Sequence, residues 1–198
     1  MTLNNQRLKE SVVGIMYFNT LGKVNTKDTA ASALKVAVEK NIKYIVVASS
    51  RGDTAKLLKN TNDINIICVT HANGYPEPGI SEMSQEIRSE LENLGVKVLT
   101  TTHVLSGAER GISKTFGGAY PVEIIAHSLR MLGQGTKVCV EVSIMALDAG
   151  LIPYGEPIIA IGGSGQGADT AVIITPSHAS SIFETKIHEI ICKPSCYK

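Results

Sequence analysis

The chain has 198 residues, a length typical of one domain with its own hydrophobic core. Lysine plus arginine number 19 and aspartate plus glutamate 18, so the formal charge of +1 argues against a general nucleic-acid binder. The 43% of hydrophobic residues excludes a disordered chain, and no apolar run reaches the roughly 20 residues of a membrane helix. We therefore expect one cytoplasmic domain over residues 1–198, with neither nucleic acid nor membrane as a partner.

Hydrophobic patterning predicts strands that alternate with helices along most of the chain. In chain order these are a strand over 12–18, a helix over 26–40, a strand over 44–48, a short helix over 52–59, a strand over 64–69, a helix over 81–93 that opens on a Ser81 cap, a strand over 96–99, helices over 121–132 and 136–149, and strands over 157–161, 170–174 and 186–192. Such alternation predicts an α/β fold, a three-layer α/β/α arrangement around a mostly parallel sheet.

Residues 100–119 interrupt this pattern. The stretch contains four glycines together with Arg110 and Lys114, and it shows no periodicity. Long segments without structure inside a domain are usually functional or mobile. We expect a loop here that acts as a lid.

The four cysteines are Cys68, Cys139, Cys192 and Cys196, and none forms a CxxC pair. Three of them lie in apolar runs, which predicts buried free thiols in a reducing compartment. A zinc site is disfavoured because Cys68 and His71 would point to opposite faces of a strand. No metal is expected.

The clearest candidate site follows the strand over 44–48. The turn consists of Ser49, Ser50, Arg51, Gly52, Asp53 and Thr54 and leads directly into a helix. Free amides at a helix start favour an anion, and a glycine lets the backbone approach it. Serine and aspartate also cap helices without any ligand, so the turn alone leaves both interpretations open.

Two further strands end in polar residues. Thr70, His71 and Asn73 follow one of them, and Thr102 and His103 follow the other. Parallel strands end at one edge of a sheet, where ligands of open α/β domains bind. We therefore expect these three turns to form one binding site.

Two other features have both a binding and a structural interpretation. The glycine-rich run that contains Gly162 and Gly163 leads into a strand, so it is either a hairpin connection or a surface for a flat ring. Glu141 lies in the apolar helix, where an unpaired carboxylate is costly. Its carboxylate either binds a ligand or, the commoner outcome, accepts hydrogen bonds from loop amides.

The turn over 48–55, together with stretches at 115–118, 137–141, 148–153, 160–171 and 186–194, resembles a known family. The chain is similar to the C-terminal α/β domain of pyruvate kinase, and more closely to the stand-alone pyruvate kinase α/β domain-like proteins of archaea and bacteria. In pyruvate kinases the corresponding turn holds a phosphate of a sugar bisphosphate. Asp53 stands where that motif has a basic residue, which disfavours a sugar bisphosphate here.

The resemblance implies a flavin mononucleotide (FMN) cofactor. Its phosphate would lie at the Ser49–Thr54 turn and its ring over the two histidine turns and Gly162–Gly163, and Phe116 and Gly117 complete the expected contacts. The catalytic barrel of pyruvate kinase is absent, so we expect no kinase activity.

We therefore expect a protein that binds a phosphorylated small molecule, with FMN as the leading candidate. One alternative is a flavin-dependent oxidoreductase, with His71 or His103 as the acid–base residue. Another is a regulatory module that senses a phosphometabolite. Assembly into a homo-oligomer stays open.

Overall fold

The structure is a computed structural model that describes residues 14–58, 63–75 and 77–195. Its strands are β1 (Met16–Phe18), β2 (Tyr44–Ala48), β3 (Asn65–Val69), β4 (Lys97–Leu99), β5 (Ile158–Gly162), β6 (Thr170–Thr175) and β7 (Lys186–Pro194). Its α-helices are α1 (Thr26–Glu39), α2 (Asp53–Lys56), α3 (Gln85–Asn93), α4 (Gly107–Phe116), α5 (Pro121–Arg130) and α6 (Gln134–Asp148). Two 3₁₀ helices, η1 (Gly22–Asn25) and η2 (Ala179–Glu184), complete the elements.

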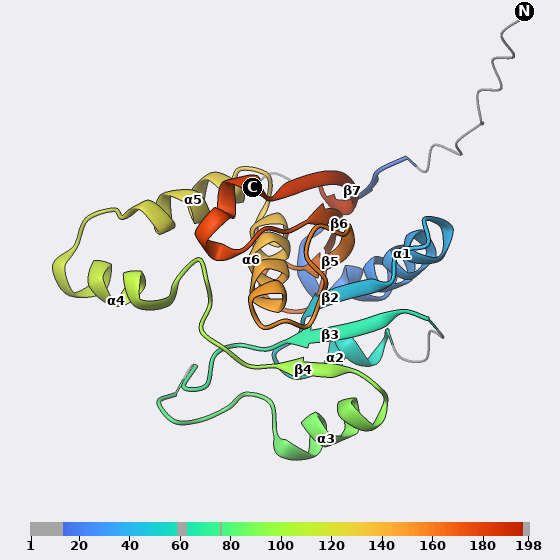
Figure 1. Ribbon diagram of the computed structural model, residues 1–198, viewed down its shortest axis with the longest axis horizontal. Coiled ribbons are helices and arrows are strands. Elements are labelled where there is room, and N and C mark those ends of the chain that lie inside the picture. The colour runs from blue at the N-terminus through green and yellow to red at the C-terminus, as the bar shows by residue number, and fades with distance from the viewer. Residues whose placement is uncertain (1–13, 59–62, 76, 196–198) are drawn as a thin grey trace, which may run out of the picture.

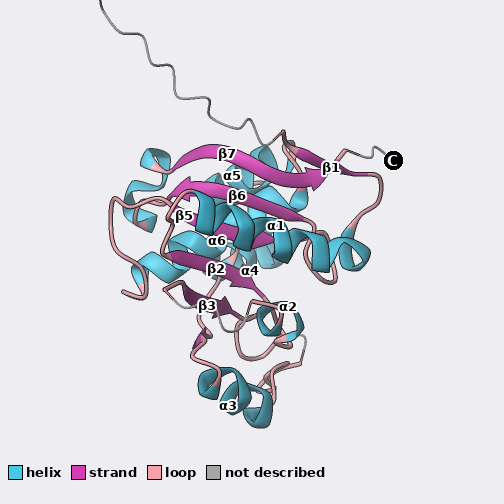
Figure 2. Cartoon of the chain, turned by 90° about the vertical axis from the view of Figure 1, so that its right-hand side faces the viewer, coloured by secondary structure: helices cyan, strands magenta, loops and turns pink. Residues whose placement is uncertain are grey.

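The seven strands form one sheet in the order β1-β7-β6-β5-β2-β3-β4. Figure 2 shows most of these strands one above another, from β7 to β3, behind α1. Parallel pairing joins β1 to β7, β2 to both β3 and β5, and β3 to β4, whereas β6 runs antiparallel to its two neighbours. The carboxyl ends of β5, β2, β3 and β4 therefore lie along one edge. The expected mostly parallel α/β sheet is confirmed.

Helices cover both faces of the sheet and make the fold three-layered (Figure 1). Alternate residues of a strand point to opposite faces, and β2 shows the consequence. Ile45 and Val47 belong to the core cluster beneath α1, whereas Val46 belongs to the cluster beneath α6. All three side chains are fully buried, which explains why this strand is apolar throughout.

Most element boundaries agree with the sequence pattern to within a few residues. The first strand was expected over 12–18, and β1 covers its end, while positions 12 and 13 lie outside the described residues. The helix expected from residue 81 begins later, at Gln85, because its cap is Ser84 rather than Ser81. Ser84 Oγ accepts the amide of Ile87, whereas Ser81 Oγ donates to the carbonyl of Met83.

The expectation that residues 100–119 form a loop without regular structure is wrong. Half of the stretch is the helix α4, which follows β4 and packs beside α5 (Figure 1). The helix carries a short apolar stripe of Ala108, Ile112 and Phe116 at a spacing of four residues, but no residue of α4 is buried, so the sequence analysis did not recognise it. The glycines at 107 and 111 also made the segment resemble a loop.

Cys68, Cys139 and Cys192 are free and buried, as the sequence predicts, and Cys196 lies outside the described residues. Within the described part of the chain, no helix is long and apolar enough to cross a membrane.

Candidate functional site

Three polar turns lie side by side at the carboxyl edge of the sheet. Ala48 pairs with Val69, and Val69 pairs with Leu99, so β2, β3 and β4 end in register. The ladder continues one step further, because the Ser49 amide donates to Val69 O and the Thr70 amide donates to Leu99 O. The prediction that these turns share one edge is therefore confirmed.

The turn after β2 keeps two amides free. Ser49 is buried, and its hydroxyl accepts the Thr54 amide at 3.2 Å, which caps the short helix α2. No described residue accepts a hydrogen bond from the amides of Ser50 or Arg51. Consecutive free amides of this kind form a concave anion-binding surface. Ser49 and Thr54 therefore shape the turn, and Ser50 and Arg51 offer donors to a ligand.

Gly52 is required by the backbone and by its neighbours. Its φ of +84° is unfavourable for other residues, and a Cβ there would lie 2.8 Å from Ile87 Cγ2 on α3. The glycine therefore lets the turn pack against α3, which explains its presence without any ligand.

Acidic groups flank the same turn. The guanidinium of Arg51 lies 3.7 Å from the Glu82 carboxylate, and Asp53 is exposed. Glu82 also binds Nδ1 of His71 in a short contact. A ligand phosphate at this turn would therefore compete with Glu82 for Arg51.

His71 and His103 lie close together, as the parallel strand ends require. Their ring centroids are 5.6 Å apart, and Tyr75 packs edge-on against His71 at 4.4 Å. With Nδ1 of His71 bound to a carboxylate, Nε2 can carry the lone pair and accept a proton. The pair of Glu82 and His71 therefore has the arrangement of a general base with an orienting carboxylate.

His103 is held between the strand edge and α6. Its Nε2 lies 3.4 Å from the carbonyl of Thr70, and its Nδ1 lies 3.9 Å from Glu141 Oε2. Burial lowers the pKa of His103, although the Glu141 charge acts in the opposite direction. The carbonyl of Thr70 and the Glu141 carboxylate thus fix the position of the His103 ring at this edge.

Glu141 has the structural partners that the sequence favoured. Its Oε1 accepts the Leu105 amide at 3.0 Å, and its Oε2 forms a buried ion pair with Lys137. Burial lowers the pKa of Lys137, and Glu141 partly offsets that effect. Glu141 thus joins α6 to the segment after β4 and reaches the site only through His103.

The remaining predicted residues differ in position. Asn73 and Thr102 are exposed at the ends of β3 and β4. Phe116 is 78% exposed at the end of α4 and Gly117 follows it, and the structure shows no contact between either residue and the three turns.

Gly162 and Gly163 serve the hairpin. A Cβ on Gly162 would lie 2.5 Å from the carbonyl oxygen of Gly135, and one on Gly163 would lie 2.2 Å from that of Gly167. The chain's own backbone therefore occupies the space beside both glycines. The β5–β6 hairpin interpretation is confirmed, and the ring-surface interpretation finds no support.

Sequence reasoning missed several residues at this edge. Glu82 and Tyr75 contact His71, and Arg88 on α3 donates to Thr100 Oγ1 at 2.6 Å. Thr100 also shares a 2.7 Å hydrogen bond with Thr70. Glu82 and Tyr75 follow His71 closely in the sequence, so they could have been considered as its neighbours. Arg88 could not, because its contact with Thr100 depends on where α3 packs.

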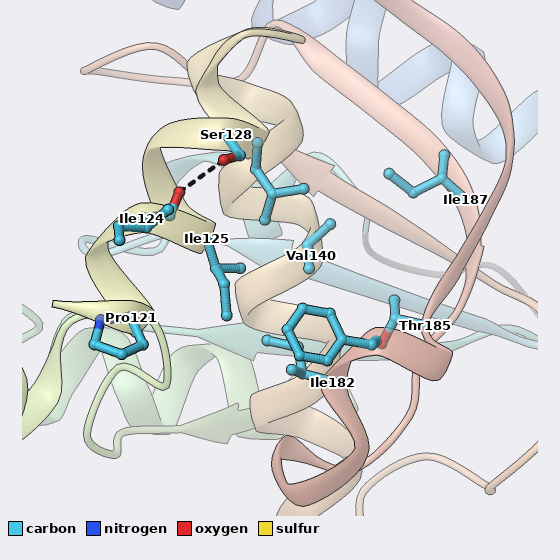
Figure 3. A pocket seen from close by; sticks show the side chains of 10 residues that line it. Pro121, Ile124, Ile125, Ser128, Val140, Ile182, Thr185 and Ile187 are labelled. Atoms are coloured by element: carbon cyan, nitrogen blue, oxygen red, sulfur yellow. Dashed lines mark hydrogen bonds between the residues drawn. The ribbon is translucent and has the colours of Figure 1, made fainter.

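Two cavities are lined by residues other than the predicted site residues of the three turns. The larger, about 680 Å³, is an apolar groove between α5, α6 and the η2–β7 segment (Figure 3). Its described lining includes no cationic side chain, and the Ser128 hydroxyl donates to Ile124 O. The groove therefore does not suit a phosphorylated ligand. The smaller cavity, about 240 Å³, lies between α4 and α5.

The sheet order and the polar carboxyl edge define an open α/β domain. The family model for the pyruvate kinase alpha/beta domain matches residues 27–174, so the chain belongs to that family, as the sequence resemblance indicated.

Similar solved structures include pyruvate kinases from Cryptosporidium parvum. Two are 18% identical with TM-scores of 0.36 and 0.34, covering 70% and 69% of this chain. A third, in complex with ADP, is 17% identical with a TM-score of 0.38 and covers 82% of this chain. The matched parts amount to 20–23% of those enzymes.

Proposed function

We propose that this protein binds a phosphorylated small molecule at the carboxyl edge of its sheet, with FMN as the leading candidate. The observation that carries the proposal is the pair of free amides at Ser50 and Arg51, placed at the same edge as the rings of His71 and His103. Backbone amides and an arginine bind a phosphate, and imidazoles offer faces and donors to a flat ring.

The residues present fit FMN in part. The phosphate would accept hydrogen bonds from the two free amides and the Arg51 guanidinium. The ring would lie against His71, Tyr75 and His103, and Thr70 and Thr100 would border it. When bound, a flavin supplies reversible hydride and electron transfer.

The experiment compares FMN with riboflavin, which lacks the phosphate, by quenching of flavin fluorescence in the purified full chain. We expect FMN to bind about tenfold or more tightly than riboflavin, because only FMN engages the turn. Arg51→Ala should weaken the binding of FMN and leave the affinity for riboflavin unchanged. Lys56→Ala, on α2 and paired with Glu90, is the matched control. Equal affinities for the two flavins, or no binding of either, would refute the proposal.

The Glu82–His71 pair favours a second candidate, a flavin-dependent oxidoreductase. Bound FMN would accept a hydride from a reduced nicotinamide, which becomes oxidised, and His71 would supply the one proton that completes the two-electron reduction. His71→Gln should then abolish turnover while FMN binding persists, and Glu82→Gln should lower it. Unchanged turnover in both variants would exclude this role, and His103→Gln tests the other histidine in the same assay.

Two further expectations belong to this proposal. A cytoplasmic location is supported by three buried, unpaired cysteines, which suit a reducing compartment. A homo-oligomer and a phosphometabolite-sensing role stay predictions, and sedimentation with and without FMN tests both.

A further inference from the structure

The cavity between α4 and α5 is lined by polar side chains from both helices. Ser106 and Arg110 lie one helical turn apart at the start of α4, and Glu123, His127 and Arg130 lie on one stripe of α5. Spacings of three and four residues place side chains on the same face of a helix. The two helices therefore present these five groups to one partly open cavity of about 240 Å³, at which Arg110 and His127 are exposed.

The donors in this cavity are largely unused. No described residue forms a hydrogen bond or ion pair with the side chains of Arg110 or His127. Arg130 uses only its Nε, which donates to Gln134 Oε1 at 2.7 Å, so both terminal nitrogens stay available. Ser106 is the N-cap residue of α4, yet its hydroxyl makes no cap hydrogen bond.

The acidic groups nearby, in contrast, have partners. Glu109 accepts the Glu123 amide at 3.0 Å, and Glu123 Oε1 accepts the Ser113 hydroxyl at 2.6 Å. Glu141 is paired with Lys137. The second carboxylate oxygen of Glu123 is the acidic atom in the wall without a described partner.

The formal charges beside the cavity balance, because Arg110 and Arg130 lie near the carboxylates of Glu109 and Glu123. Those carboxylates accept hydrogen bonds from an amide and a hydroxyl, and within the described residues neither forms an ion pair with Arg110 or Arg130. The guanidinium N–H groups therefore remain available to a ligand. Arginines bind phosphate oxygens with paired hydrogen bonds, which makes them the usual residues for this recognition.

We propose that the α4–α5 cavity is a second anion-binding site that takes a compact phosphoryl group. Its volume falls below the roughly 300–1,000 Å³ of pockets for drug-sized ligands, so a flavin ring does not fit within it. Arg110 and Arg130 would hold the oxygens, and Ser106 and His127 would donate to them. The phosphoryl group belongs either to inorganic phosphate or to a small phosphomonoester. This site is separate from the Ser49–Thr54 turn and does not depend on FMN binding.

Calorimetric titration of the full chain tests the proposal, with inorganic phosphate and glycerol phosphate as probes in low-salt buffer. We expect the double substitution Arg110→Gln and Arg130→Gln to weaken phosphate binding at least about tenfold, because each hydrogen bond to a charged group contributes strongly to the binding free energy. Lys114→Gln, an exposed charge on α4 outside the cavity lining, is the matched control and should change little. Tighter binding of glycerol phosphate than of phosphate identifies the ester as the source, and the reverse identifies the free ion.

Arg51→Ala separates this site from the proposed function. Loss of phosphate binding in Arg51→Ala alone would place the anion at the turn after β2 and overturn the cavity site. Absence of phosphate binding to the unsubstituted chain would overturn it as well. Loss in the double variant with FMN affinity retained would support the cavity independently. Because both arginines project from the cavity wall rather than the core, circular dichroism should show an unchanged fold.

Discussion

Gly162 ends β5 directly opposite the first turn of α6, where Gly135 lies. A Cβ on Gly135 would lie 2.1 Å from Thr170 Oγ1, so neither glycine leaves room for a side chain. Together they let α6 approach β5 and β6 closely. Gly135 and Gly162 therefore set how closely α6 packs on the sheet. The position of α6 in turn sets the position of the Glu141 carboxylate.

Gly162→Ala should therefore lower the free energy of unfolding by about 1–3 kcal/mol, because the new methyl group meets the Gly135 carbonyl and Val138 Cβ. Gly111→Ala in α4 is the matched control, since a Cβ there meets open space. That control should gain up to about 1 kcal/mol from better helix propensity. Urea unfolding of the three proteins measures both changes. Equal midpoints for Gly162→Ala and the unsubstituted chain would contradict this account.

The individual site residues could be predicted only where they follow a strand. Ser49, Thr70 and His71 were found because a strand end fixes its own position on the sheet edge. Glu82 and Arg88 reach the same edge from outside the strands, so no local pattern marks them. Phe116 was proposed only from the family resemblance, and the structure shows it exposed with no contact to the three turns.

α6 is the last helix of the β4–β5 connection, the segment that also contains α4 and α5, and it packs directly on the sheet. It is buried along most of its length, and it carries one ion pair, Lys137–Glu141, inside the protein. The same carboxylate accepts the Leu105 amide, which anchors the segment that leads to α4. The Lys137–Glu141 pair therefore stabilises the β4–β5 connection as well as α6.

Glu141→Gln should cost about 3–5 kcal/mol of unfolding free energy, since it leaves Lys137 buried without a counter-charge. Adding Lys137→Met should recover a large part of that loss, because the unpaired charge is then removed. A double-mutant cycle from urea unfolding measures the coupling. Additive losses in the double variant would show that the two side chains do not stabilise each other.

Helices were predicted from sequence where a local signal marked them. α1 was located by apolar residues at helical spacing and α5 by Pro121 in its first turn, and both predictions agree with the structure to within two residues at either end. α4 was missed because Gly107 and Gly111 made its short apolar stripe resemble a loop. α6 begins at Gln134 although Gly133 and Gly135 lie on either side of that residue. Close packing of α6 on the sheet overrides the low helix propensity of glycine.

The three buried thiols lie in three different parts of the core. They come from β3, α6 and β7, and burial raises the pKa of Cys68 to about 12 and that of Cys192 to about 11. Burial also raises the pKa of Cys139 well above its usual value. Only the thiolate reacts with alkylating reagents, so each thiol is protected both by burial and by protonation.

In a Cys196→Ser variant, iodoacetamide at pH 8 should therefore label the folded protein at least about a hundredfold more slowly than the urea-unfolded chain. Two pKa units alone reduce the thiolate of Cys192 about a hundredfold. Mass spectrometry of timed samples counts the modified thiols. Rapid labelling of any one of the three in the folded protein would show that its region of the core opens locally.

The fold class was predictable because strands and helices alternate, but the strand order was not. β1 pairs with β7 through residues 16–18 and 192–194, a contact across nearly the whole chain. Local patterns carry no information on such distant pairing. The reversal of β6 was hinted at only by its short glycine-rich connection to β5.

The route from β4 at the sheet border to β5 in its interior passes through α4 and α5 before α6 returns the chain to the strands (Figure 1). Since α4 buries no residue, this detour can change length at little cost to strand pairing. The exposed glycine pair at 117 and 118 is therefore a suitable splice point for a fluorescent reporter, whose signal would follow movements of α4 in the otherwise intact protein.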